Sequence, residues 1–182
     1  MLLPLDVSTI VSVRNFASSL VARITSGELP RIRSLICAAA IMQVKGKQMT
    51  EDGMETNFQI NYLANFLLVL FLMPVMRKDC RIMFFTSNLI SDAGSAQGPR
   101  IPGFEEFQEK LPDLVTEKSK GNFDEGTMRY GMSKKLLSMF AAELQRRLDA
   151  SSGFGGVSVV TLDPGTFVSG MINGTLTFLG FL

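Results

Sequence analysis

Short apolar runs of strand length alternate with longer segments of helical periodicity along this chain of 182 residues. The strand-length runs lie at residues 2–7, 32–40, 81–86 and 157–162, and the helical patterns lie at 10–24, 55–76 and from 127 onward. The later runs are almost continuously apolar, as expected for strands covered on both faces. This alternation predicts an α/β chain with a parallel sheet between helices, folded as one domain over residues 1–182.

Residues 55–76 form the longest predicted helix, which ends near Pro74. Its apolar part, residues 62–76, is 15 residues long and contains Asn65. A bilayer-spanning helix needs about 20 apolar residues, so we expect a helix buried in a large core and no stable membrane span. Near the amino terminus, Ser8 is the predicted N-cap of the first helix.

Composition excludes several kinds of chemistry. The chain has no histidine, which removes Ser-His-Asp and Cys-His nucleophiles and His-ligated zinc, and we expect no metal site. A formal charge of +1 offers no basic excess for nucleic acid. Cys37 and Cys80 are too far apart for a Cys-x-x-Cys pair, and two thiols in a chain of this size indicate a reducing, cytoplasmic location.

Ligands of parallel α/β sheets bind beyond the carboxyl ends of the strands. Here those ends fall at Asp6, at residues 38–40, at Ser87, and at Pro164 and Gly165. Residues 88–126 form the one irregular region, rich in glycine, proline and mixed charges. A loop of this length is usually functional or disordered. We therefore look for chemistry at the strand ends.

Tyr130 and Lys134 stand four residues apart at the start of a predicted helix, so both side chains project from one face. A nearby ammonium favours a phenolate, and we expect Lys134 to lower the pKa of Tyr130. The Ser87 hydroxyl, at a strand end, can donate to a substrate oxygen. Asn61 lies in the long apolar helix, where an unpartnered amide is costly. For Tyr130 and Lys134, the alternative to a catalytic role is an ordinary pair on a helix surface. For Asn61, the alternative is an amide that is hydrogen-bonded to a neighbouring strand.

In order and in element, Asn61, Ser87, Tyr130 and Lys134 resemble the catalytic tetrad of the short-chain dehydrogenase/reductases. Residues 50–68 are similar to the family segment TxDGxExxFxxNhxGxFxL, most of all in its retinol-dehydrogenase-like branch, and residues 130–134 match YxxSK. Residues 163–169 resemble the PGxVxT segment beside the nicotinamide, and residues 5–8 resemble the Asp-bearing turn that contacts adenine. The resemblance covers nearly the whole chain.

The resemblance implies an oxidoreductase that transfers a hydride between NAD(P), with NADP slightly favoured, and a small-molecule carbonyl or alcohol. In that reaction Tyr130 would exchange the proton, Lys134 would lower the pKa of Tyr130 and hold the nicotinamide ribose, Ser87 would bond the reacting oxygen, and Asn61 would anchor a water. The implied cofactor-binding residues are Asp6, Ala38, Ala39, Lys134, Pro164, Gly165 and Ser169. The insert at 88–126 would help to select the substrate. The long helix and the Tyr130 helix would form a homodimer interface.

The chain departs from the family on its amino-terminal side. It has no Gly-rich TGxxxGxG turn, and residues 37–40 read Cys-Ala-Ala-Ala where the family has Asn-Asn-Ala-Gly. The expected fold is therefore a partial Rossmann-type, doubly wound parallel sheet that lacks the first strands, with residues 32–40 as an open edge. On this resemblance we expect the last strand and the substrate lid, after Ser169, to be essentially absent.

Two alternatives to the enzyme remain. One is a catalytically inactive remnant that acts as a binding or dimerisation partner, and the other is an unrelated α/β binding module with a chance Tyr-Lys pair. If Met1 is the true start of the protein, we expect no measurable dinucleotide affinity.

Overall fold

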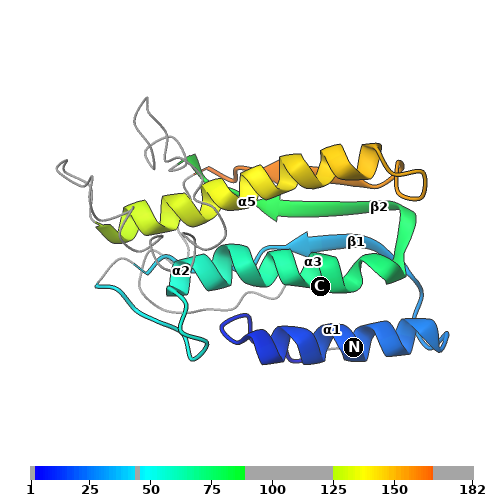
Figure 1. Cartoon of the computed structure of the whole chain (residues 1–182), viewed down its shortest axis with the longest axis horizontal. Helices are drawn as coiled ribbons and strands as arrows, with labels where there is room; N and C mark the ends of the chain where they lie inside the picture. Colours follow the sequence, from blue (N-terminus) through cyan, green and yellow to red (C-terminus); the bar gives the residue numbers. More distant parts are fainter. Residues whose placement is uncertain (1–2, 44–45, 89–124, 166–182) are drawn as a thin grey trace.

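The computed structural model describes residues 3–43, 46–88 and 125–165. Along the chain its elements are helix α1 (Ile10–Thr25), strand β1 (Ile32–Cys37), helix α2 (Thr56–Phe58), π-helix η1 (Gln59–Leu63), helix α3 (Ala64–Leu72), 3-10 helix η2 (Met73–Val75), strand β2 (Met76–Phe85), helix α5 (Glu125–Asp149) and strand β3 (Ser158–Leu162). In Figure 1 the long helices lie alongside the strands. Most of the predicted insert at 88–126 lies outside the described residues.

The three described strands form one parallel sheet in the order β1-β2-β3. Met83 of the central strand β2 pairs with Ile36 on one side and with Val160 on the other. The α/β class and the parallel sheet predicted from the sequence are confirmed. Strand β1 is an edge of this sheet, as expected, while β2 begins at Met76 and is five residues longer at its start than residues 81–86.

The strand predicted over residues 2–7 does not form in its described part, residues 3–7. Local hydrogen bonds replace strand pairing there: the backbone N–H of Asp6 donates to Oγ of Ser12 at 2.9 Å, and the backbone N–H and hydroxyl of Ser8 both donate to Oδ1 of Asp6. The N-cap of α1 is Thr9, whose side chain accepts from the N–H of Ser12, and the prediction of Ser8 is wrong.

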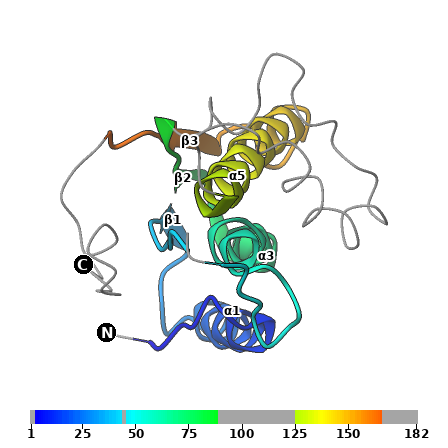
Figure 2. The same cartoon turned by 90° about the vertical axis from the view of Figure 1, so that its left-hand side faces the viewer.

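Helices α3 and α5 cover one face of the sheet, and α1 packs against α3 (Figure 2). The β2 side chains that face these helices are completely buried; they are Cys80, Ile82 and Phe84. Within residues 3–43, 46–88 and 125–165, the predicted helical cover is found on this face only. On the opposite face, Ile36 of β1 is 60% exposed and Leu162 of β3 is 43% exposed.

The predicted long helix extends from Thr56 to Val75 as consecutive α, π, α and 3-10 segments. Pro74 lies in the closing segment η2, where a proline is compatible with the end of a helix. Among the described residues this is the one helix long and apolar enough to cross a membrane, and more than half of its most apolar window is buried. A core helix of a globular domain has the same character.

Candidate active site

The first turns of α5 bring Tyr130 and Lys134 into the interior of the molecule, where both side chains are buried. Nζ of Lys134 lies 5.7 Å from the centre of the Tyr130 ring. The two side chains therefore share one face of the helix, as their spacing predicts. The alternative of a solvated surface pair does not describe them.

The Lys134 ammonium is held at the carboxyl end of β2. It donates a hydrogen bond of 2.8 Å to the backbone carbonyl of Phe85, the last residue of that strand. Burial disfavours the charged form and lowers the pKa of Lys134 to about 8. At pH 7 the side chain is still mostly protonated, so a cation stands beside the Tyr130 ring.

The pKa of Tyr130 is raised above its ordinary value, chiefly because burial disfavours the phenolate. A hydrogen bond with the Ser87 side chain acts in the opposite direction, and the negative charge of Asp163 adds to the rise. This net direction is opposite to the one expected from the Tyr130–Lys134 spacing. The ammonium already donates to Phe85, and its effect does not offset the burial of the phenol.

Ser87 follows β2 by two residues and is half-buried. Its hydrogen bond with Tyr130 joins the strand end to the amino-terminal part of α5. The structure thus brings together Ser87, Tyr130 and Lys134, three of the four residues singled out for catalysis. An oxygen placed against both hydroxyls would meet two donors and a nearby cation.

Asn61, the fourth of these residues, lies in the π-helix η1 and is completely buried. Its Oδ1 accepts from the backbone N–H of Ile41 at 2.9 Å, and its Nδ2 donates to the carbonyl of Ile41 at 2.9 Å. Two such bonds hold the segment after β1 as a neighbouring strand would. The expectation of a partner for this amide is confirmed, and that partner is a loop backbone.

Ser133 connects Asn61 to Tyr130. The Nδ2 group of Asn61 donates to Oγ of Ser133 at 2.9 Å, and this hydroxyl donates to the backbone carbonyl of Tyr130 at 2.7 Å. Ser133 is the serine of the YxxSK motif, and the sequence alone assigned it no role. A serine one place before the lysine of this motif is the signal in the sequence that could have indicated it.

Apart from Lys134, the described residues expected to bind a cofactor are more exposed than the Tyr130 and Lys134 side chains. Ala38 and Ala39 follow β1 on the loop that Asn61 holds, and Ala38 is exposed. Pro164 and Gly165 follow β3 in an exposed turn, closed by a hydrogen bond from the N–H of Gly165 to Oδ1 of Asp163 at 2.9 Å. Ser169 lies outside the described residues.

Asp6 is exposed and precedes α1. The start of that helix lies at the same end of the molecule as the carboxyl ends of β1 and β2 (Figure 1). Asp6 lines a shallow surface depression together with Thr9, Ser12 and Asn15. It is therefore placed at the expected end of the sheet, outside the cluster around Tyr130.

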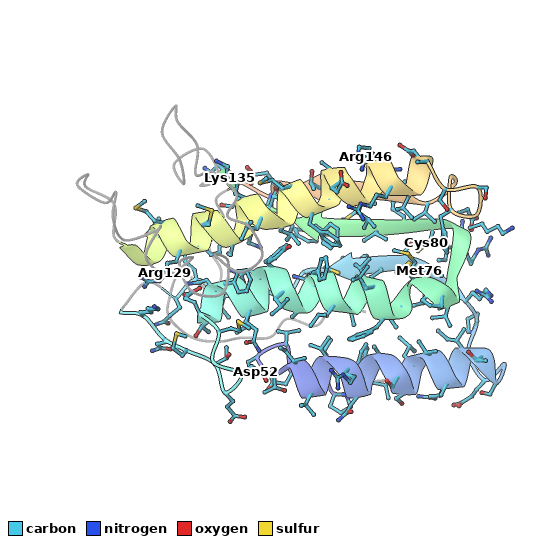
Figure 3. All side chains as sticks on the ribbon, viewed as in Figure 1. Asp52, Met76, Cys80, Arg129, Lys135 and Arg146 are labelled. Atoms are coloured by element: carbon cyan, nitrogen blue, oxygen red, sulfur yellow. The ribbon has the colours of Figure 1, made fainter. Side chains whose placement is uncertain are left out.

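Sequence reasoning missed a second buried polar cluster, built on Glu55 and Arg129. These side chains form an ion pair with 3.4 Å between Nε and Oε1, and both are buried. In Figure 3 Arg129 lies at the end of the molecule where α5 begins. A basic residue directly before Tyr130, on a face that must pack against the long helix, is the signal available in the sequence.

No protein-family model matches the chain. Among curated proteins, a short-chain dehydrogenase of Talaromyces variabilis is 30% identical over 195 residues, which cover 92% of this chain and 53% of that protein. Human retinol dehydrogenase 13 is 30% identical over 161 residues, which cover 88% of this chain and 41% of that protein. The chain thus spans about half the length, or less, of these curated relatives.

Solved structures with a similar fold also match most of this chain. An uncharacterised protein from Mycobacterium paratuberculosis superposes with a TM-score of 0.64 at 24% identity, over 93% of this chain and 52% of that one. A Burkholderia cenocepacia short-chain dehydrogenase in complex with NADP gives a TM-score of 0.61 at 19% identity, over 93% of this chain and 54% of that one.

Proposed function

Because the chain belongs to the short-chain dehydrogenase/reductase family, we propose that it carries the catalytic residues of an NAD(P)-dependent oxidoreductase acting on a carbonyl or alcohol. The observation that supports this most is the cluster of Ser87, Tyr130 and Lys134 at the carboxyl end of β2. Cofactor complexes of fold neighbours also support it: one short-chain dehydrogenase structure contains NADP, and a 3-alpha-hydroxysteroid dehydrogenase structure contains NADH.

The residues at the strand ends fit such a cofactor. An ammonium has three donors, and among the described residues Lys134 uses one of them on Phe85. The hydroxyls of a ribose can accept from the others. A Cβ added at Gly165 would meet no described residue within 4 Å. When bound, a nicotinamide dinucleotide supplies the hydride.

Tyr130 supplies the proton in the reductive direction. Its raised pKa keeps the phenol protonated at neutral pH, so it can donate to a carbonyl oxygen as negative charge develops there. The Lys134 ammonium, 5.7 Å from the ring centre, then stabilises the phenolate that forms. Ser87 bonds the same substrate oxygen and orients it toward Tyr130. In the oxidative direction the proton moves from the alcohol to Tyr130.

Asn61 serves this site through the backbone. Both of its Nδ2 hydrogens have partners, Ile41 and Ser133, and its Oδ1 accepts from Ile41. We therefore assign Asn61 to holding the loop that bears Ala38 and Ala39, rather than to binding a water with its side chain. This loop follows the carboxyl end of β1, where ligands of parallel α/β sheets bind.

The test is turnover by the purified chain, followed by nicotinamide absorbance with NADPH or NADH and a panel of aldehydes and ketones. We expect Tyr130→Phe to lower the rate by about 100-fold or more, because it removes the one proton-exchanging atom. Tyr62→Phe, which removes the other tyrosine, is the control and should retain activity. Full turnover by Tyr130→Phe would contradict the assigned chemistry.

A catalytically inactive chain that binds a partner is the second candidate. The face of the sheet that none of the described helices covers favours it, because apolar Ile36, Val160 and Leu162 are exposed there. Calorimetry with NADPH and NADH separates the candidates: dinucleotide binding supports the enzyme, and its absence supports the binding role.

We also propose a homodimer through the outer faces of α3 and α5, where Leu70 is 43% exposed and Met139 is 38% exposed. Light scattering should give twice the monomer mass, and Leu70→Lys should return it to the monomer. A cytoplasmic location agrees with Cys37 and Cys80, which are free thiols in the structure.

A further inference from the structure

Arg129 is a buried guanidinium that the proposed chemistry does not use. It directly precedes Tyr130 on α5 and is only 5% exposed. Removing a charge of this kind from water costs several kcal/mol unless it is paired and hydrogen-bonded. Its position next to the proposed acid raises the question of what this buried charge does.

The partners of Arg129 come from two other segments. Its Nη2 donates to the backbone carbonyl of Gly46 at 2.6 Å, and its Nε lies 3.4 Å from Oε1 of Glu55. Glu55 is also buried and is the N-cap of α2. Its Oε2 accepts from the N–H of Phe58 at 2.8 Å, and its Oε1 accepts from Nδ2 of Asn57 at 2.9 Å.

The Glu55 carboxylate therefore caps the helix that leads to Asn61, and it also pairs with Arg129, the residue before Tyr130. Asn57 extends the connection, because it bonds both backbone groups of Gln43 at 2.9 Å, just as Asn61 bonds those of Ile41. The loop after β1, the start of the long helix and the start of α5 thus meet at a single ion pair.

We propose that Arg129, through its ion pair with Glu55, is a positioning residue for Tyr130. Among the bonds of the described residues, this ion pair and the bond from Asn61 to Ser133 both connect the amino-terminal part of α5 to the long helix and its N-cap. Of these two connections, the ion pair involves the residue directly before Tyr130, so we expect it to help set the depth at which the phenol is buried. The proposal rests on the proposed function for the importance of Tyr130, but its test does not need turnover.

The alternative is that the ion pair only stabilises the fold. The two roles differ in what they do to the phenol. If Arg129 sets the depth of Tyr130, removing it lets water reach the ring, and the pKa of Tyr130 falls from its raised value toward the ordinary ~10. If Arg129 contributes stability alone, the folded fraction keeps the same phenol environment and the same pKa.

The chain is suited to this measurement because it has two tyrosines and no tryptophan. In a Tyr62→Phe background, the carbon-13 signal of labelled Tyr130 reports one phenol. We expect Arg129→Met to lower the pKa of Tyr130 by about half a unit or more. Glu55→Gln, which keeps an oxygen to cap Phe58, should shift it in the same direction. The double variant should shift it by less than the sum.

Gly156→Ala, in the turn between α5 and β3, is the control for lost stability without a change at the ion pair. If Arg129→Met does not fold, Glu55→Gln decides, since it removes the charge of the pair and keeps the size of the replaced side chain. An unchanged pKa of Tyr130 in the folded variants would overturn the proposal. A shifted pKa in a chain that shows no hydride transfer would leave it standing and refute only the proposed function.

Discussion

The ammonium of Lys134 donates to the backbone carbonyl of Phe85 at 2.8 Å, and so connects helix α5 to the carboxyl end of the central strand. This bond holds a cation in the core, where burial lowers its pKa from 10.5 to about 8. The folded chain therefore releases the Lys134 proton at a lower pH than the unfolded chain does. Deprotonation of Lys134 consequently favours the folded chain. The stability of the protein therefore depends on pH in a direction that can be worked out.

We expect Lys134 to raise the free energy of unfolding by about 1 kcal/mol between pH 8 and 9, because the unfolded chain still binds the proton that the folded chain releases. The Cys37 thiol opposes this rise within the same window and above it, because burial raises its pKa from 9.0 to about 12 while the thiol of the unfolded chain ionises near pH 9. Urea unfolding at the two pH values measures the change. Lys134→Met should abolish it and Lys135→Met should keep it; an equal rise in both variants would assign it to another group.

Two substitutions near Tyr130 should shift its pKa in opposite directions. Ser87→Ala removes the hydrogen bond that favours the phenolate and should raise the pKa of Tyr130 further, whereas Asp163→Asn removes a repelling charge and should lower it. We expect shifts of roughly half a unit to one unit, the smaller for Asp163 because that side chain is exposed. Labelled-tyrosine spectra in the Tyr62→Phe background give both values. Shifts of the same sign would contradict the arrangement at this site.

The sequence was sufficient for the features that depend on local pattern. Strand-length apolar runs predicted β1, β2 and β3, and an i, i+4 spacing placed Tyr130 and Lys134 on one face of α5. It failed where the outcome depends on a partner far along the chain. Residues 3–7 look like a strand, but among the described residues they have no strand beside them.

The prediction that the pKa of Tyr130 is lowered failed for a related reason. Spacing indicates that an ammonium is near, but the sequence does not reveal how deeply the phenol is buried or that Phe85 already accepts from that ammonium. The Arg129–Glu55 ion pair joins residues 74 positions apart, and no local periodicity predicts such a pair. Depth of burial and long-range pairing both come from the packing of α5 on the long helix.

Replacing the buried side-chain amide of Asn61 by a group without N–H donors should destabilise the protein. Asn61→Asp keeps an acceptor for the N–H of Ile41 but loses both donations, to the carbonyl of Ile41 and to Ser133, and it buries a carboxylate. We expect a loss of about 3 kcal/mol or more in the free energy of unfolding. The same change at Asn15, exposed on α1, should cost less than about 0.5 kcal/mol. Equal effects in urea unfolding would mean that the Asn61 bonds contribute little.

The turn between α5 and β3 contains a position where only glycine fits. A Cβ at Gly156 would lie 2.6 Å from the backbone carbonyl oxygen of Lys78 in β2, well inside contact distance, and a backbone atom cannot move aside without disturbing the sheet. At the neighbouring Gly155 the nearest atom, the carbonyl oxygen of Ser151, is at an ordinary 3.8 Å. We therefore expect Gly156→Ala to lower the free energy of unfolding by about 1–3 kcal/mol, as overpacking does in protein cores.

Gly155→Ala is the matched control, one residue away in the same turn, and it should be close to neutral or slightly stabilising, since alanine restricts the unfolded chain more than glycine does. Urea unfolding at neutral pH compares the two variants. The comparison also tests the register of the sheet, because the clash exists only if β3 enters beside residue 78 as described. If the two variants were equally stable, the approach of this turn to β2 would have to be wider than the structure has it.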